Sequence, residues 1–165
     1  MGAMISPASF SRLESLVKSA VADGARLIVG GRRYDHPVYK QGSYFQPTLL
    51  VDVTASMEIA KEECFGPICV VMRASDAAHA VEIANSPNFG LGASVFGANG
   101  YEINEVARAV RSGMVAVNDF GAYYAVQLPF GGVGGSGYGR FAGEEGLRGL
   151  CNIKGICREI GRAHV

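Results

Sequence analysis

The sequence lacks an excess of charge of either sign, since its 15 basic and 15 acidic residues give a formal net charge of zero. Without a basic field, the chain is not suited to gathering nucleic acid or an anionic membrane. It also lacks any run near the roughly 18 apolar residues of a membrane span, and no signal peptide is visible. These absences predict a cytoplasmic protein without nucleic-acid or membrane contacts; an upstream targeting or anchor segment stays open.

The sequence is also poor in metal-ligand patterns. Its four cysteines, at positions 64, 69, 151 and 157, form no C-x-x-C pair, and its three histidines stand far apart. Because zinc sites need such ligands at close, regular spacing, we expect no metal site. Scattered cysteines also predict free thiols in a reducing compartment. Glycine, by contrast, is plentiful, with 23 residues where average composition would give about 12.

Periodic apolar residues predict the secondary structure. An amphipathic helix is expected from Ser6-Pro7 to Asp23-Gly24, with further helices after Ser75 and from Tyr101 to Ser112. Strands are expected at 27–29, 44–53, 68–72, 92–97 and 114–117, and those at 27–29, 68–72 and 92–97 are expected to be buried. This alternation predicts one compact α/β domain with a largely parallel sheet.

The most informative stretch is Glu62-Glu63-Cys64-Phe65-Gly66-Pro67, directly before the predicted strand at 68–72. Its Gly-Pro pair predicts a defined turn, which gives the two carboxylates a fixed place at the mouth of a strand. A carboxylate only accepts hydrogen bonds and so suits the hydroxyls of a ribose, while an adjacent ring can cover a flat part of the same ligand. A surface turn with two solvated acids is the alternative.

A second candidate site follows the predicted strand at 114–117. Asn118 and Asp119 stand at its carboxyl end, where ligands gather in α/β folds. The segment 120–130 then supplies an apolar set that is typical of a pocket wall, namely Phe120, Tyr123, Tyr124 and Phe130. An ordinary hydrophobic loop packed on the core explains this segment equally well.

The stretch 131–140 holds six glycines in ten residues, and Gly132 to Gly137 matches G-x-G-x-x-G. A dinucleotide fingerprint should follow a strand, open a helix and precede an acidic residue by about twenty positions. Here a Pro-Phe pair precedes the glycines and further glycines prevent an immediate helix. We therefore interpret the stretch as a backbone path with tight turns and close approaches.

Together these stretches resemble the aldehyde dehydrogenase superfamily, in its order and near its spacing over almost the whole chain. The resemblance is carried by 62–67, the Asn-Ser-Pro-Asn-Phe-Gly-Leu run at 85–91, Val117-Asn118, the Pro-Phe-Gly-Gly run at 129–132, the Ser-Gly-Tyr-Gly-Arg run at 136–140, and Gly143-Glu144. The run from Asn118 to Cys151 is most similar to the plant and fungal branch. The resemblance implies a three-layer α/β fold like the family's catalytic domain, with a C-terminal edge strand.

The resemblance also implies roles for the matched residues. Glu63 is similar to the family's acid that binds the nicotinamide ribose, and Phe65 to the aromatic beside it. Asn118 corresponds to a residue near the substrate tunnel, and Phe130 to an aromatic of the aldehyde pocket, which Tyr123 or Tyr124 is expected to line as well. NAD or NADP is the implied cofactor of the full-length enzyme, and an aldehyde its implied substrate.

Other parts that the family needs are missing from this sequence. No Gln-x-Cys motif supplies the thiolate nucleophile, and the upstream glutamate base and the Rossmann domain are absent too. Cys64 stands at a variable position with no base placed to activate it, so we do not expect it to act instead. We expect no catalytic residue here: the chain resembles a C-terminal fragment of an NAD(P)-dependent aldehyde dehydrogenase that is inactive and binds no cofactor alone.

The expected boundaries are an expression scar at 1–4, the catalytic-domain part at 5–150, an oligomerisation strand at 151–160 and a tail at 161–165. An exposed edge strand at 151–160 implies a homo-oligomer. A function of another class is a non-catalytic truncated paralogue that uses this strand as an interaction module. The coding sequence upstream of Ile5 separates the two, because a frame that continues into a Gln-x-Cys motif indicates a fragment.

Overall fold

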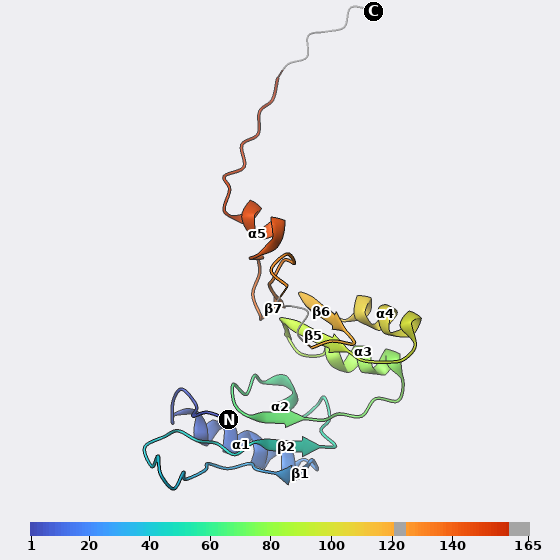
Figure 1. Cartoon of the computed structure of the whole chain (residues 1–165). Coiled ribbons are helices and arrows are strands. Elements are labelled where there is room, and N and C mark those ends of the chain that lie inside the picture. The colour runs from blue at the N-terminus through green and yellow to red at the C-terminus, as the bar shows by residue number, and fades with distance from the viewer. Residues whose placement is uncertain (121–124, 159–165) are drawn as a thin grey trace, which may run out of the picture.

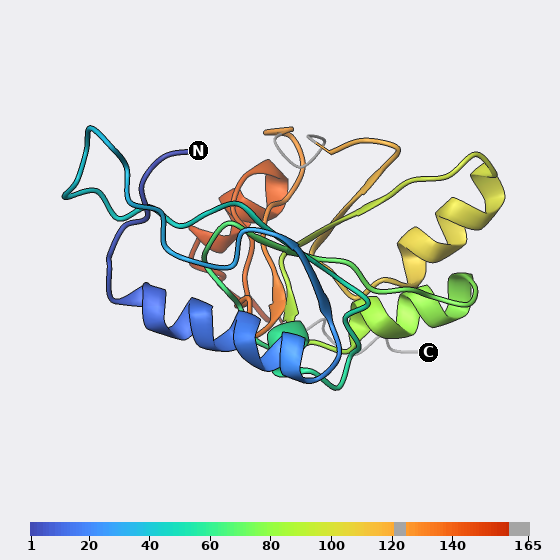
Figure 2. The same ribbon diagram turned by 90° about the horizontal axis from the view of Figure 1, so that it is seen from below.

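The computed structural model describes residues 1–120 and 125–158, whose helices and strands form two groups (Figure 1). The first group is α1 (Ser9–Ala22), β1 (Arg26–Val29), β2 (Thr48–Val51), α2 (Glu58–Lys61) and β3 (Ile68–Val70). The second is α3 (Ala77–Asn85), β4 (Phe89–Gly90), β5 (Gly92–Val95), α4 (Gly100–Ala109), β6 (Met114–Val117), β7 (Val133–Gly134) and α5 (Gly143–Gly149). The view from below shows α1 along the first group, with α3 and α4 together away from it (Figure 2).

The main core lies under α1. The apolar stripe that predicted this helix consists of Phe10, Leu13, Leu16, Val17, Ala20 and Val21. The structure buries all of them except Val21, which is 44% exposed. Leu16 and Val17 belong to one buried cluster with Leu50 of β2 and Ile59 of α2. Leu13 and Leu50 are fully buried. The helix therefore packs against both the first sheet and α2, which leads into the turn at 62–67, called the acidic turn below. This packing removes the apolar face of the helix from water.

Within residues 1–120 and 125–158, the strands form three small sheets that mix parallel and antiparallel pairs. The first sheet has the order β1-β2-β3, with β1 antiparallel and β3 parallel to β2. β5 and β6 pair in parallel, while β4 and β7 pair antiparallel. The predicted α/β class is confirmed, and the sheets are mixed rather than largely parallel. β1 and β2 have no helix between them, and antiparallel neighbours need no helical crossover.

The predicted burial of the strands at 27–29, 68–72 and 92–97 is wrong. No residue of β5 is buried, and Phe96 directly after it is 66% exposed. Leu27, Ile28 and Val29 of β1 are 41%, 52% and 56% exposed, and β3 is only partly buried. Both strands stand at the edges of the three-stranded sheet. An edge strand has a neighbour on one side only, so an apolar sequence there does not ensure burial.

The predicted strand at 151–160 is not present in the described part of the chain. Residues 151–158 form no strand, and they run away from the folded body beyond α5 (Figure 1). Residues 159 and 160 lie outside the described residues. A strand needs a partner for its backbone N–H and C=O groups, and no described strand pairs with this segment. Its role in an oligomer stays a prediction.

The N-terminus of α3 is capped by Asp76, one residue after Ser75, where the sequence predicted the helix to begin. The Asp76 carboxylate accepts a hydrogen bond from the backbone N–H of His79 (2.8 Å) and another from the Ser75 hydroxyl (2.9 Å). These two donors, the first above all, lower the pKa of Asp76 below its usual value. A cap of this kind satisfies backbone N–H groups that the helix itself leaves without a partner.

The lowered pKa predicts how the stability of the chain depends on pH. The folded pKa of Asp76 lies below the unfolded one, so its stabilisation is complete above the unfolded value and disappears as the pH falls through the folded value. We expect the melting temperature of Asp76→Ala to lie below that of the unaltered chain at pH 7, with a smaller gap at pH 3. Thermal melts followed by circular dichroism measure the gap, and a gap that is constant from pH 7 to pH 3 contradicts the prediction.

Candidate functional site

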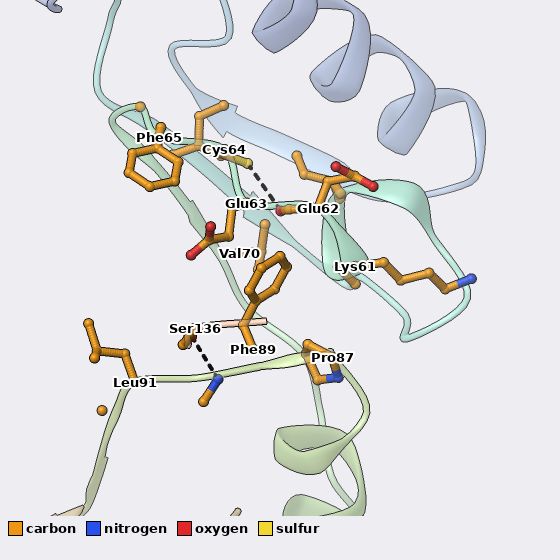
Figure 3. Close-up of a pocket in the computed structure, with 16 residues that line it drawn as sticks. Lys61, Glu62, Glu63, Cys64, Phe65, Val70, Pro87, Phe89, Leu91 and Ser136 are labelled. Carbon is orange, nitrogen blue, oxygen red and sulfur yellow. Dashed lines mark hydrogen bonds between the residues drawn. The ribbon is translucent and has the colours of Figure 1, made fainter. Parts of the chain in front are cut away.

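A cavity of about 580 Å³ lies between the two groups of elements (Figure 3). One wall is the acidic turn with the end of α2 and β3, and the opposite wall is the segment from Pro87 to Gly92 with Ser136. The side chain of Phe89 points across the gap toward Val70 in Figure 3. The cavity therefore brings the predicted cofactor-binding residues Glu63 and Phe65 to one face of a shared opening.

The acidic turn is held in place from both sides. On one side, the Arg12 side chain of α1 donates hydrogen bonds to the backbone oxygens of Glu63 and Cys64. On the other, the backbone N–H of Thr48 donates to the Pro67 oxygen at 2.8 Å, where β2 and β3 begin. These contacts fix a turn that lies outside any helix or strand, as the Gly-Pro pair predicted.

Glu63 and Phe65 both face away from the core. The Glu63 carboxylate points toward the space between the two walls, whereas the neighbouring Glu62 carboxylate points away from it (Figure 3). Within the described residues, no hydrogen bond to the Glu63 carboxylate is found. Phe65 is 83% exposed and so does not belong to the core. An accepting carboxylate and a free aromatic ring thus stand at the cavity mouth, two residues apart.

Cys64, between these two residues, has the opposite environment. It is half-buried and packs against both buried clusters beneath α1. Burial raises the pKa of its thiol, and the opposing effect of Arg12 is smaller. Because the thiolate is the nucleophilic form, this position does not suit a reactive cysteine.

The second predicted site lies next to the first. Phe120 and Phe130 line an apolar cavity of about 470 Å³. The Phe130 ring also contacts the Phe141 ring, with centroids 4.7 Å apart and the ring planes tilted by 37°. Leu91 and Gly92 line both this cavity and the one beside Glu63, so the two cavities share a wall. Tyr123 and Tyr124, predicted for the same pocket, lie outside the described residues.

Asn118 follows β6, as predicted, but its side chain is engaged by the backbone. Its amide oxygen accepts from the Gly97 N–H (2.8 Å), and its amide nitrogen donates to the Gly97 oxygen (2.9 Å). The residue also adopts a left-handed backbone conformation with φ of 50°. Asn118 therefore joins the ends of the parallel strands β5 and β6, and both of its hydrogen-bonding groups are used in doing so.

Sequence reasoning missed two residues that line the first cavity and one that supports its wall. Phe89 of β4 and Ser136 of the glycine-rich stretch line the cavity, and the Ser136 hydroxyl accepts from the Gly90 N–H at 3.0 Å. Arg12 of α1 does not line the cavity and instead holds the acidic turn. All three are separated from the acidic turn by more than twenty residues, so no local pattern connects them with it. Phe89 and Ser136 each carried one signal, because they lie in the family-like runs at 85–91 and 136–140.

Within the described residues, no group of three or more His, Cys, Asp and Glu side chains is arranged to hold a metal ion. In the same ranges, no helix combines the length and the apolar character of a membrane span.

Comparison with known proteins identifies the family. Residues 1–156 match the aldehyde dehydrogenase family. This chain belongs to that family. An aldehyde dehydrogenase-like protein of Saccharomyces cerevisiae is 62% identical over 157 residues, which are 95% of this chain and 24% of the relative. A similar protein of Schizosaccharomyces pombe is 59% identical over 94% of this chain and 30% of its own length.

Solved structures of the family share the fold. The crystal structure of a Mycobacterium tuberculosis aldehyde dehydrogenase complexed with NAD+ superimposes with a TM-score of 0.87 at 31% identity. The match covers 99% of this chain and 33% of that enzyme. The chain thus spans about a quarter to a third of the length of these aldehyde dehydrogenase relatives.

Proposed function

We propose that this chain forms the wall of an aldehyde dehydrogenase active site that receives the nicotinamide ribose of NAD or NADP. The observation that carries the proposal is the Glu63 carboxylate, which faces a cavity and accepts no hydrogen bond from the described residues. Two adjacent ribose hydroxyls can both donate to one carboxylate. Phe65, at the same mouth, offers a flat apolar face to the nicotinamide part.

The residues present fit one end of the dinucleotide only. The glycine-rich stretch forms β7 and turns, and the next helix, α5, begins only at Gly143. It therefore lacks the strand-to-helix turn that binds a pyrophosphate. When bound, NAD(P) supplies the hydride acceptor. This chain orients the nicotinamide ribose, and another part of the enzyme supplies the remaining contacts with the dinucleotide.

The apolar cavity beside Phe130 is the proposed aldehyde pocket. It shares Leu91 and Gly92 with the cofactor cavity, so a substrate there would lie next to the nicotinamide end. Asn118 supports this pocket by joining the ends of β5 and β6, rather than through a free amide. In the whole enzyme, the reaction is oxidation of an aldehyde to a carboxylic acid.

The experiment that tests this function is a titration with nicotinamide riboside, which contains the nicotinamide and the ribose without phosphate. Amide NMR spectra of the chain would be recorded as the riboside is added. We expect weak, saturable binding, with the largest shifts at Glu63 and Phe65. Saturable shifts confined to other surfaces, or none, would overturn the proposed function.

The chain alone is expected to have no dehydrogenase activity. The family reaction needs a thiolate that adds to the aldehyde, and the only cysteine at the site is half-buried with a raised pKa. Propanal and NAD would be supplied to this polypeptide, and the absorbance of NADH followed, with a full-length aldehyde dehydrogenase as the positive control. Sustained formation of NADH by the chain would contradict this expectation.

A further inference from the structure

The side chain of Arg12 connects α1 to the turn that carries Glu63 and Phe65. Its Nη2 atom lies 2.8 Å from the backbone oxygen of Glu63 and 2.9 Å from that of Cys64. These partners are 51 and 52 residues away along the chain. Hydrogen bonds with a charged donor are roughly twice as strong as neutral ones. One guanidinium group therefore holds two consecutive peptide units against the helix.

This turn needs support, because its backbone is unusual. Phe65 has a φ of 47°, in the left-handed region, which is unfavourable for a residue with a side chain. The next residue, Gly66, approaches α1 so closely that a Cβ atom there would lie 2.6 Å from Cδ1 of Leu13. Arg12 and Leu13 thus contact the turn on either side of Phe65. Through these contacts, α1 supports the left-handed backbone conformation of Phe65.

We propose that Arg12 is the positioning residue of the nicotinamide-ribose site. With the carbonyl oxygens of Glu63 and Cys64 held toward α1, the Glu63 carboxylate lies on the other side of the turn and faces the cavity (Figure 3). Arg12 does not line the cavity and acts only through the turn. The proposal rests on the proposed function of Glu63, and it assigns the orientation of that carboxylate to a residue in α1.

The test compares Arg12→Ala and Arg12→Lys with Lys18→Ala, an exposed control on the same helix. We expect Arg12→Ala to shift the amide NMR signals of Glu63, Cys64 and Phe65. It should also raise the dissociation constant of nicotinamide riboside about tenfold, the effect expected if a ribose hydroxyl loses its hydrogen bond to the displaced Glu63 carboxylate. Arg12→Lys keeps the charge and should give an intermediate value. Lys18→Ala should bind as the unaltered chain does.

A double-mutant cycle separates positioning from general structural support. If Arg12 acts through Glu63, Arg12→Ala should weaken binding little further once Glu63→Gln is present, so the two effects are not additive. Full additivity, or turn amides that do not move in Arg12→Ala, would overturn the proposal. An unchanged dissociation constant in Arg12→Ala would overturn it as well. If the unaltered chain binds no riboside, the proposed function fails, whereas the turn amides still report whether Arg12 holds the turn.

Discussion

Leu50→Ala is expected to lower the free energy of unfolding by about 3 kcal/mol, the usual cost of removing a fully buried leucine side chain. Leu50 is 0% exposed and lies in the cluster that joins α1, β2 and α2. A cavity there cannot be filled by moving one helix, because three elements meet around it. A loss of this size is a large part of the stability of a small domain. Urea denaturation followed by circular dichroism measures it.

Leu147→Ala is the matched control for this substitution. Leu147 lies in α5 and is 69% exposed. Surface substitutions usually change the free energy of unfolding by no more than about 0.5 kcal/mol. Equal losses for the two variants would show that the buried cluster beneath α1 is not the main core of the chain.

Glu63→Gln is expected to weaken the binding of nicotinamide riboside by about tenfold, since a charged acceptor is replaced by a neutral amide of the same shape. The carboxylate faces the cavity and has no hydrogen-bond donor among the described residues, so the substitution removes little from the fold itself. The melting temperature should therefore stay close to that of the unaltered chain. NMR titration gives the dissociation constant.

Two comparisons sharpen this prediction. Glu62→Gln should weaken binding less than twofold, because the Glu62 carboxylate points away from the opening (Figure 3). Nicotinamide without ribose should bind Glu63→Gln and the unaltered chain equally well, since the carboxylate is proposed to hold the ribose hydroxyls. Equal losses for both glutamate variants would indicate a general effect of charge, and the ribose role of Glu63 would then be wrong.

Much of the local structure was predictable because its causes are local. The stripe of Phe10, Leu13 and Leu16 predicted α1, and the structure buries it. The alternation of helices with strands predicted the α/β class. The short strands β4 and β7 were not predicted, because two-residue strands carry no periodic pattern and form only when Phe89 and Gly134 meet across the fold.

Some features of the candidate site were likewise predictable from local sequence, and others were not. The acidic turn was visible in the sequence, because a Gly-Pro pair after two acids before an apolar run is a local pattern. The engagement of Asn118 by Gly97 was not, because it depends on how β5 and β6 pair. The sequence near a strand end does not distinguish a side-chain amide that faces a ligand from one that bonds a neighbouring loop.

The sequence by itself determined which residues make up the candidate site: a carboxylate, an aromatic ring two positions later and the turn that carries both. Only the tertiary structure decided the direction in which they point. Arg12 reaches the turn from 51 residues away, and Leu13 of the same helix packs against Gly66. The physical reason is that a turn's conformation follows from its own residues, whereas its orientation depends on contacts that exist only after the chain has folded.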